Sequence, residues 1–473
     1  MSDIDVRTLP AQRAALSIRR WLALPVILAG TFMVTLDFFI VNVAIPSIQV
    51  ELHTGTASIE WVVAGYGLAY AALLIIGGRL GDLHGRRRIF CAGVVVFTLA
   101  SAACGLAPNA GWLVLGRAAQ GVGAALLSPQ VLAILGTIYV GADRVRAFAC
   151  YGVVLGIASA CGQVIGGLLI QADVFGLGWR ACFLVNLPVG LIALLLSPAL
   201  VPESRAASGT RLDLVGAALV TLGIASLLLP LIEGRARGWP AWTWLCFVAT
   251  AALSTSFVAH QRRRAGRGVA PLVDPALFQV RGFGTGLLAA LSLFGGVASS
   301  FFVLALYLQQ GRGLAPLPSG LVFSTLAVAF TATSLSAGWI GGRLRRPTLV
   351  PGALGMALGL GTLGLTVGCI GVGGSVGWLV AALLVDGAGM GLVMAPLAAT
   401  VLAGLPGHHA GAAAGVLVTA QQLANALGVA LVGLVYFGAL PHGGCANAFT
   451  ASVWCLAALA LVLVGLVWRL RPA

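Results

Sequence analysis

Lysine is absent from this chain of 473 residues, and acidic residues are few. The 27 basic side chains other than His are all Arg, and they stand against 13 Asp and Glu. A Walker A loop needs a Lys on the nucleotide phosphates, so the sequence excludes an ATP-driven pump built on this chain alone. Charged residues make up 8% of the chain, whereas soluble domains carry about a quarter. The sequence therefore indicates a membrane protein.

Hydrophobic residues make up 59% of the sequence and form long runs. A transmembrane helix needs about 20 mostly apolar residues. The first run is too long for the hydrophobic region of a signal peptide, so we expect an uncleaved span there. We predict an all-α integral membrane protein with fourteen transmembrane helices, near residues 21–45, 58–78, 89–107, 111–138, 148–171, 181–200, 213–232, 240–260, 283–308, 317–341, 348–371, 376–402, 411–438 and 447–469.

The net charge of +14 comes from short Arg clusters between the apolar runs, such as Arg86–Arg88 and Arg262–Arg264. Positive residues favour the cytoplasmic side of a membrane. With both termini in the cytoplasm, nearly all Arg residues lie inside. Outside lie only Arg180, Arg235, Arg237 and Arg312. We therefore expect a multi-pass plasma-membrane protein with cytoplasmic termini, and no nucleic-acid partner.

Two longer polar segments divide the chain. We expect a six-helix bundle at 1–200, two additional helices with flanking cytoplasmic loops at 201–282, and a second six-helix bundle at 283–473. The two bundles share weak repeats: GGRLGDLHGRRR resembles GGRLRRP, and GVGAALLSP resembles GMGLVMAP, at a similar offset. Parallel repeats with a substrate site between them are typical of transporters.

Charged residues inside the apolar runs are costly and usually functional. Asp37 lies about 16 residues into an outward-running span, roughly 24 Å up a hydrocarbon core of about 30 Å. Arg117 lies about six residues into an inward-running span, roughly 9 Å below the outer surface. Their matched depth predicts an ion pair or a shared polar cavity. Such a pair is either a static contact between spans or one in which a proton on Asp37 releases Arg117.

Three further acidic residues lie in or beside spans. Asp386 falls near mid-membrane, and we interpret it as a second protonatable or substrate-facing carboxylate; the alternative is a locally satisfied residue. Glu60 and Asp213 fall at span ends, where we expect their side chains to reach the interface.

Five stretches resemble motifs of the major facilitator superfamily, in particular of the fourteen-span drug:proton antiporters of the EmrB/QacA type. In chain order they are LDFFIVNVAIP (36–46), GGRLGDLHGRRR (77–88), LVLGRAAQGVGAA (113–125), WRACFLVNLPVG (179–190) and DLVGAALVTLGIASLLLPLIEG (213–234). The resemblance covers nearly the whole chain and implies two six-helix bundles that transport by alternating access.

The resemblance also implies roles for residues that match its motifs. Arg117 would take part in proton coupling. The loop between the second and third spans would latch the two halves on the cytoplasmic side, through Gly78, Asp82, Gly85 and Arg86. The fifth span keeps the glycines of an antiporter packing motif, Gly156, Gly162, Gly166 and Gly167, but Gln163 stands where that motif has Pro. His84 replaces the usual Arg of the loop motif.

The leading hypothesis is a proton-coupled exporter of small hydrophobic or amphipathic compounds such as drugs or antibiotics. The alternatives are a facilitator of an endogenous metabolite or lipid, or an importer. Candidate cavity residues are Asn42, Trp61, Tyr66, Gln120, Gln130, Phe302, Gln309 and Gln421; each could instead serve ordinary packing or interhelical hydrogen bonding.

Other classes of function are disfavoured. The six His residues form no HxxxH pair and the nine Cys form no CxxC pair, so we expect no metal site, no cofactor and no membrane-embedded enzyme. No filter-like loop or ring of charges indicates a channel. The expected partners are a small-molecule substrate, protons and the lipid bilayer. The Gly- and Ala-rich, Lys-free composition suggests a GC-rich bacterial genome.

Overall fold

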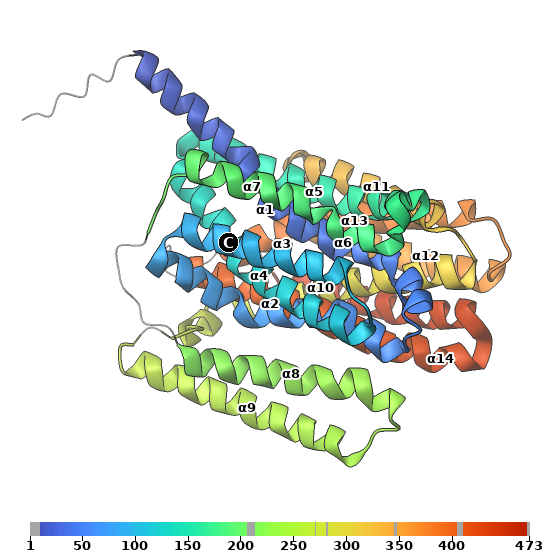
Figure 1. Cartoon of the computed structure of the whole chain (residues 1–473). Coiled ribbons are helices and arrows are strands. Elements are labelled where there is room, and N and C mark those ends of the chain that lie inside the picture. The colour runs from blue at the N-terminus through green and yellow to red at the C-terminus, as the bar shows by residue number, and fades with distance from the viewer. Residues whose placement is uncertain are drawn as a thin grey trace, which may run out of the picture.

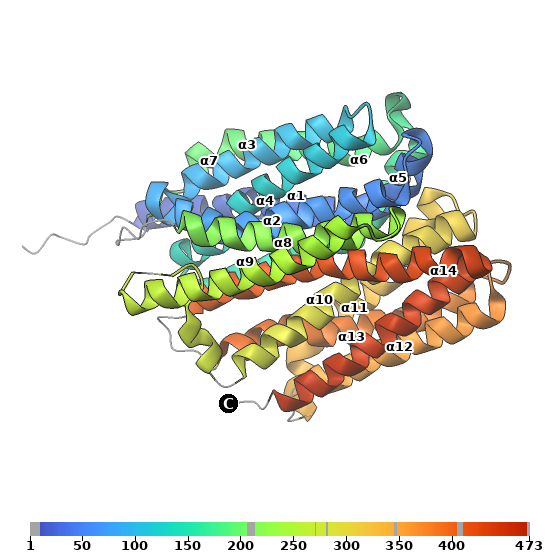
Figure 2. The same ribbon diagram turned by 90° about the horizontal axis from the view of Figure 1, so that it is seen from below.

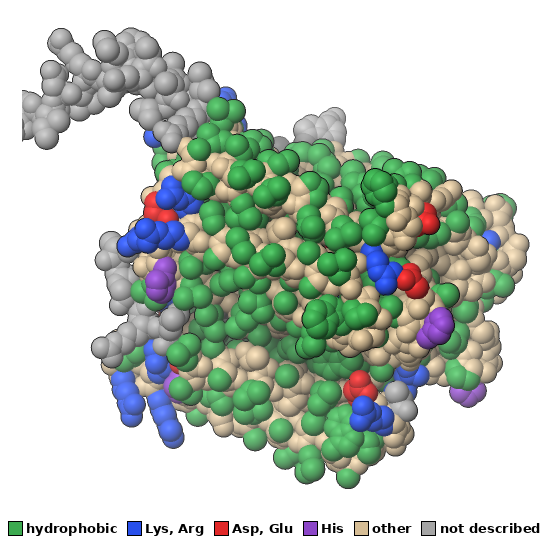
Figure 3. All heavy atoms as spheres, in the orientation of Figure 1, with side chains coloured by type: hydrophobic (Ala, Val, Ile, Leu, Met, Phe, Trp, Pro, Cys, Tyr) green, Lys and Arg blue, Asp and Glu red, His purple; other side chains and the backbone are tan. Residues whose placement is uncertain are grey.

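A computed structural model describes residues 10–205, 213–269, 271–280, 282–344, 348–403 and 410–470. Every regular element in these ranges is a helix. Lipid offers no hydrogen-bond partners, so a spanning segment must satisfy its backbone groups internally, which a helix does. On the face in Figure 3, charged side chains lie at the two ends of the helices and apolar side chains cover the surface between them.

The first group of helices carries the loop motif and the two central charges. It comprises α1 (Pro10–Glu51), α2 (Thr56–His84), α3 (Arg86–Gly105), α4 (Ala110–Ile138), α5 (Gly141–Ala172), α6 (Ala181–Leu184) and α7 (Asn186–Leu200), with the short 3₁₀ turns η1 (Val174–Gly176) and η2 (Gly178–Arg180). Within it α2 packs on α4, α4 on α3, and α1 on α5 and α7. Figure 1 shows these helices side by side.

The second group follows the two additional helices, α8 (Leu214–Ala236) and α9 (Ala241–Gly266). It comprises η3 (Pro275–Gln279), α10 (Phe283–Leu306), the π-helical η4 (Tyr307–Gly311), α11 (Pro316–Leu344), α12 (Leu349–Ile370), α13 (Gly377–Ala403) and α14 (Ala410–Arg469). Here α10 and α12 pack on α14, and α11 and α12 on α13. The view in Figure 2 separates the two groups, blue to green above and yellow to red below.

Thirteen helices in the described ranges are long and apolar enough to cross a membrane. The last lies in α14, an element of 60 residues whose helical backbone is interrupted by a kink at Gly443 and Gly444. Gly444 has a φ of 69°, which glycine adopts without strain. In Figure 2 the two arms of α14 run to one end of the molecule and back again.

The additional helices lie along one side of the molecule (Figure 1). Helix α8 packs on both α2 and α14, which belong to different groups, whereas α9 packs mainly on α8. The apolar contact between α8 and the two groups contains Ala64 of α2, Leu228 of α8 and Ala430 of α14. Helix α8 therefore covers the seam where the two groups meet.

Glycines let α5 approach both groups closely. A Cβ atom on Gly162 would crowd Phe39, and one on Gly166 would crowd Ile40, both on α1. One on Gly167 would lie 2.6 Å from the Pro316 carbonyl oxygen on α11. A Cβ on Gly156 would only make an ordinary contact with Thr331. The close packing expected of this motif is thus present at three of its four glycines.

Gln163 stands where the motif has Pro, and α5 runs through it without a break. Its side chain is 1% exposed, and neither amide atom has a hydrogen-bond partner among the described residues. A Cβ atom on Gly320 of α11 would lie 2.5 Å from the backbone carbonyl oxygen of Gln163, so the two helices are in close contact here. With Gln at this position the helix is therefore continuous, and an amide is buried where the two groups meet.

Candidate functional site

Asp37 of α1 and Arg117 of α4 form a fully buried ion pair. Both side chains are 0% exposed, and the Arg117 Nη1 donates to Asp37 Oδ2. The contact expected from their matched depth is present. It arises because α1 and α4 run in opposite directions, so that positions far apart in the sequence reach the same level.

Amide side chains complete the coordination of the Asp37 carboxylate. Gln120 Nε2 donates to Asp37 Oδ1 at 2.9 Å and Asn186 Nδ2 at 3.1 Å. Gln120 Nε2 also donates to Ser101 Oγ at 2.8 Å. Helices α4 and α7 thus supply three donors to one carboxylate on α1, and Ser101 of α3 accepts from both amides.

Arg117 is held independently of Asp37. Its Nε donates to the Val62 carbonyl oxygen of α2 at 2.9 Å, and its Nη1 also donates to Gln120 Oε1. The guanidinium lies 4.4 Å from the Tyr66 ring centroid, a distance that allows cation–π attraction. Its Nη2 has no hydrogen-bond partner in the described part of the chain. If Asp37 is neutralised, Arg117 therefore keeps its hydrogen bond to Val62, and its Nη2 can donate to a new partner.

Two members of this cluster were not singled out from the sequence. Asn186 lies inside the stretch that resembles the entry to the sixth span, and Ser101 lies in the third apolar run. A lone Asn in an apolar segment is a usable signal. A Ser is not, because its hydroxyl commonly bonds to its own helix.

The candidate cavity residues do not converge on one place. Tyr66 and Gln120 join the Asp37 cluster. Asn42 donates to carbonyl oxygens of its own helix, and Gln130 donates to the Gly77 carbonyl oxygen, which ties α4 to α2. Trp61 donates to Glu233 at 3.1 Å, which places it against α8 and away from Asp37.

The remaining candidates belong to the second group of helices. Gln309 donates to the Val43 carbonyl oxygen of α1 at 3.1 Å and so joins the two groups. Phe302 is buried and packs edge-on against Phe437. Gln421 is half-buried. These positions are compatible with packing, the alternative interpretation given to each of them.

The α2–α3 loop is built around Gly85, whose φ is 107°. Arg86 Nη2 lies 3.0 Å from Asp82 Oδ1, four residues earlier. Glu203, which follows α7, accepts the Arg87 backbone N–H at 3.1 Å, and a Cβ on Gly85 would lie 2.7 Å from its carboxylate. These contacts stay inside the first group. A Cβ atom on Gly78 would make only an ordinary contact with Pro129, and the GGRLRRP copy extends beyond the described residues.

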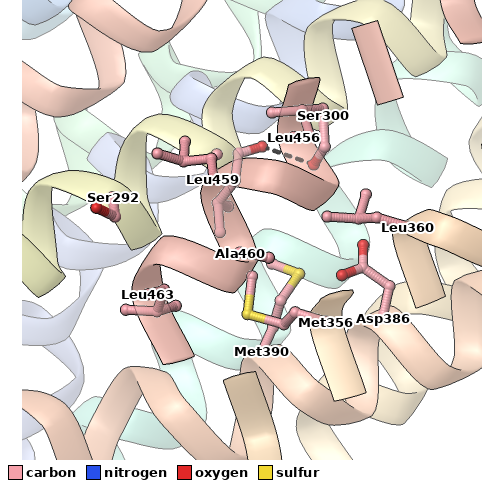
Figure 4. Close-up of a pocket in the computed structure, with 12 residues that line it drawn as sticks. Ser292, Ser300, Met356, Leu360, Asp386, Met390, Leu456, Leu459, Ala460 and Leu463 are labelled. Atoms are coloured by element: carbon pink, nitrogen blue, oxygen red, sulfur yellow. Dashed lines mark hydrogen bonds between the residues drawn. The ribbon is translucent and has the colours of Figure 1, made fainter. Parts of the chain in front are cut away.

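Asp386 of α13 is buried within the second group. Its side chain is 2% exposed, and Oδ1 has no hydrogen-bond partner among the described residues. It points into a small cavity between α10, α12, α13 and the second arm of α14, beside Leu360 and the two thioethers of Met356 and Met390 (Figure 4). The cavity has room for about one water molecule. This space is too small for a drug-sized substrate.

Two predictions about span ends were wrong. Glu60 and Asp213 were expected to reach the interface, yet they are 1% and 6% exposed. Glu60 is covered by α8 and α14, and the sequence did not indicate that these helices pack over it. Asp213 is the N-cap of α8, accepting the Gly216 N–H at 2.9 Å, and it also receives His260 and Gln261 from α9.

Asp213 lies outside the apolar span, and its pKa is lowered. Burial alone would raise that pKa, but bonds from the Gly216 N–H, His260 and Gln261, with Arg264 at 3.5 Å, outweigh it. The carboxylate thus clamps α9 to α8 in its ionised form.

Comparison with known proteins decides the family. The sequence model of the Major Facilitator Superfamily matches residues 27–429. The chain belongs to the major facilitator superfamily. The predicted resemblance to the superfamily is confirmed, and with its many apolar helices the protein is a multi-pass membrane transporter.

Similar proteins have names that refer to antibiotics. A probable actinorhodin transporter of Streptomyces coelicolor is 39% identical over 89% of this chain and 73% of its own length. The puromycin resistance protein pur8 of Streptomyces alboniger is 38% identical over 92% of this chain and 86% of its own length. The cephamycin export protein CmcT of Amycolatopsis lactamdurans is 35% identical over 85% of this chain and 82% of its own length.

Solved structures of more distant transporters share the fold. A POT family transporter superposes with a TM-score of 0.69 at 15% identity, covering 95% of this chain and 96% of its own. A D-xylose–proton symporter superposes with a TM-score of 0.67 at 17% identity, covering 95% and 97%. At these identities the likeness concerns the fold alone.

Proposed function

We propose that this transporter exports small hydrophobic or amphipathic compounds, antibiotics among them, in exchange for protons. The names of its relatives support the export of antibiotics. The observation that carries proton exchange is the buried Asp37–Arg117 pair. A buried ion pair is a poor stabiliser compared with apolar packing, so its presence in the first group favours a functional role.

The architecture that we propose has fourteen spans with both termini in the cytoplasm. The break at Gly443 and Gly444 divides α14 into two arms, each long enough to cross a core of about 30 Å. The thirteenth and fourteenth spans are these arms. The Arg distribution supports the orientation, and the far ends of α1 and α10 then face outward. We divide the chain into bundles of six, two and six helices at residues 1–200, 201–282 and 283–473. The packing of the helices into groups supports this division.

The proton step follows from the partners of Asp37. A proton entering from outside forms an O–H bond on the carboxylate and removes its negative charge. Arg117 Nη1 then loses its ionic partner, while Nε keeps the Val62 carbonyl oxygen. The contact between α1 and α4 weakens. Loss of the proton to the cytoplasm restores the pair and completes the cycle.

The other predicted residues take supporting roles in this proposal. Asp386 is a second protonatable carboxylate, in the second half. Gly78, Asp82, Gly85 and Arg86 form the cytoplasmic gate, where Asp82 holds Arg86. Tyr66 and Gln120 link the proton site to the substrate path. An importer, or a facilitator for a metabolite or lipid, is the alternative, and the direction of transport distinguishes it.

Transport by the purified protein in liposomes tests the proposal. With a proton gradient imposed, wild type should move radiolabelled puromycin or ethidium against its gradient, and Asp37→Asn should lose the gradient-driven component. Asp143→Asn is a matched control, because Asp143 is 53% exposed at a helix end, where its ion pair in the described part of the chain is with Arg146. Gradient-driven transport that survives Asp37→Asn would overturn the coupling role of Asp37.

The orientation is tested separately with a single cysteine at the position of Arg88, in a variant without the native cysteines. That side chain is 66% exposed. An impermeant maleimide should label it in inverted vesicles and not in intact cells. Labelling from the cell exterior would contradict the proposed orientation and indicate the opposite one.

A further inference from the structure

A second buried carboxylate lies where α8 covers the seam between the two groups. Glu60 of α2 is 1% exposed. A Cβ atom on Gly433 would lie 3.1 Å from the Glu60 carboxyl carbon, so the carboxylate is directly against the backbone of α14. It therefore touches elements of both groups and of the additional pair.

The partners of Glu60 are weak. Its Oε1 lies 3.9 Å from Arg235 Nη2, beyond hydrogen-bond length, and its Oε2 has no hydrogen-bond partner within the described residues. Asp37, equally buried, receives Arg117 and two amides. Burying an ionised carboxylate without hydrogen-bond donors is costly.

Arg235 of α8 is engaged elsewhere. Its Nη2 donates to Thr56 Oγ1 on α2 at 3.0 Å, and its guanidinium lies 5.1 Å from the Phe437 ring centroid on α14. One Arg of the additional helices thus holds a helix of each group. The attraction between Arg235 and Glu60 adds an ionic contact between α8 and α2.

The charged surroundings of Glu60 are simple. Among the described residues, two charged groups act on it, Arg235 and Glu233, and both come from α8. Glu233 is already bonded to the Trp61 indole at 3.1 Å and to Arg237 Nε at 3.1 Å. Toward Glu60, α14 presents the backbone at Gly433, while the Phe437 ring lies against Arg235. A proton is therefore the ligand that the vacant Oε2 can take without rearrangement.

We propose that Glu60 is a proton-binding site, separate from the Asp37 site, and that its occupancy sets how tightly α8 holds α2 to α14. A proton on Oε2 forms one O–H bond and cancels the charge that attracts Arg235. Arg235 keeps Thr56 and Phe437 but loses its ionic partner, so α8 loosens at the seam. The additional helices thereby sense proton concentration. Neither the direction of transport nor its cargo enters this inference.

Infrared spectra of the reconstituted protein test the binding step without any substrate. The difference between wild type and Glu60→Gln should contain a protonated-carboxyl band near pH 5 and a carboxylate band near pH 9. The same form at both pH values would overturn the proposal. Spectra of Asp37→Asn serve as the control, because that variant should keep the Glu60 change even if proton coupling at Asp37 is wrong.

Spin labels test the consequence at the seam. In a cysteine-free variant, labels at Leu229 of α8 and Leu431 of α14 occupy exposed positions. We expect a longer mean distance at low pH, and Glu60→Gln should show the long distance at every pH. Glu233→Gln is the matched control and should keep the pH dependence. A pH-dependent distance that survives Glu60→Gln, or its absence in wild type, would overturn the coupling between Glu60 and α8.

Discussion

Each group of helices buries an aspartate, and the two have opposite surroundings. Asp37 in the first group is bonded to Arg117, Gln120 and Asn186. Asp386 in the second has an oxygen without a hydrogen-bond partner among the described residues and a cavity lined mostly by Met, Leu and other apolar residues, with Ser292 and Ser300. The weak sequence repeat between the halves therefore does not extend to their polar chemistry.

This difference separates two uses of a buried acid. A carboxylate surrounded by donors is stabilised as an ion, and its neutralisation releases those donors, Arg117 above all. A carboxylate in an apolar cavity has no donors to release and gains most from becoming neutral. Under the proposed function, a proton on Asp37 would act on α4 through Arg117, whereas a proton on Asp386 would change little beyond its own cavity.

The largest expected effect comes from removing the cation of the first pair. Arg117→Leu leaves Asp37 buried without a counter-charge, which costs about 3–5 kcal/mol. We expect a large fall in the thermal unfolding midpoint of the purified protein, followed by Trp fluorescence and by size-exclusion profiles after heating.

The double variant Asp37→Asn with Arg117→Leu is the control. It removes both charges, so most of the lost stability should return. A double variant as unstable as Arg117→Leu would mean that Arg117 stabilises the fold through Val62 and Tyr66, and the contrast between the two aspartates would lose its electrostatic basis.

The opposite sign is expected in the second group. Asp386→Leu removes a buried oxygen that lacks a partner, and such a group costs about 1–3 kcal/mol. The midpoint should therefore rise, and Asp386→Asn, which keeps polar atoms in the cavity, should gain less. If Asp386→Leu lowers the midpoint as far as Arg117→Leu does, Asp386 has a partner in the folded protein and the comparison fails.

Depth was predictable from the sequence, but rotation about each helix axis was not. A helix rises 1.5 Å per residue, so counting along opposed spans aligned Asp37 with Arg117. Counting cannot say which way a side chain points. For this reason Asn186 and Ser101 were missed, and Trp61 was expected at a central cavity although it faces Glu233 on α8.

The additional helices were the other limit. Hydropathy located α8 and α9 along the chain, but nothing in their sequence fixed which helices they would cover. The covering of Glu60 follows entirely from the packing of α8 on α2 and α14. Asp213 was misjudged for a related reason. Its partners His260 and Gln261 come from α9, and they face Asp213 only because α8 and α9 fold back on each other.

Asp213 offers the smallest and sharpest comparison, because it is buried like Asp386 but hydrogen-bonded like Asp37. Its pKa is lowered in the folded protein. A depressed carboxyl pKa contributes stability above the unfolded value, and this is lost as pH falls through the folded value. Asp213→Asn, which keeps a capping side chain but loses the charge, should therefore lower stability at pH 7 by about 1 kcal/mol.

The same deficit should shrink as pH falls below about 3.9, the pKa of Asp in an unfolded chain. Unfolding midpoints of wild type and Asp213→Asn, measured in one detergent across this range, should converge in acid. Asp213→Ala, which also removes the cap, should keep an additional deficit at every pH. A constant difference between wild type and Asp213→Asn would show that the charge of Asp213 adds nothing. In that case, hydrogen-bond donors around a buried carboxylate would not stabilise its ionised form, and the difference drawn between Asp37 and Asp386 would lose its basis.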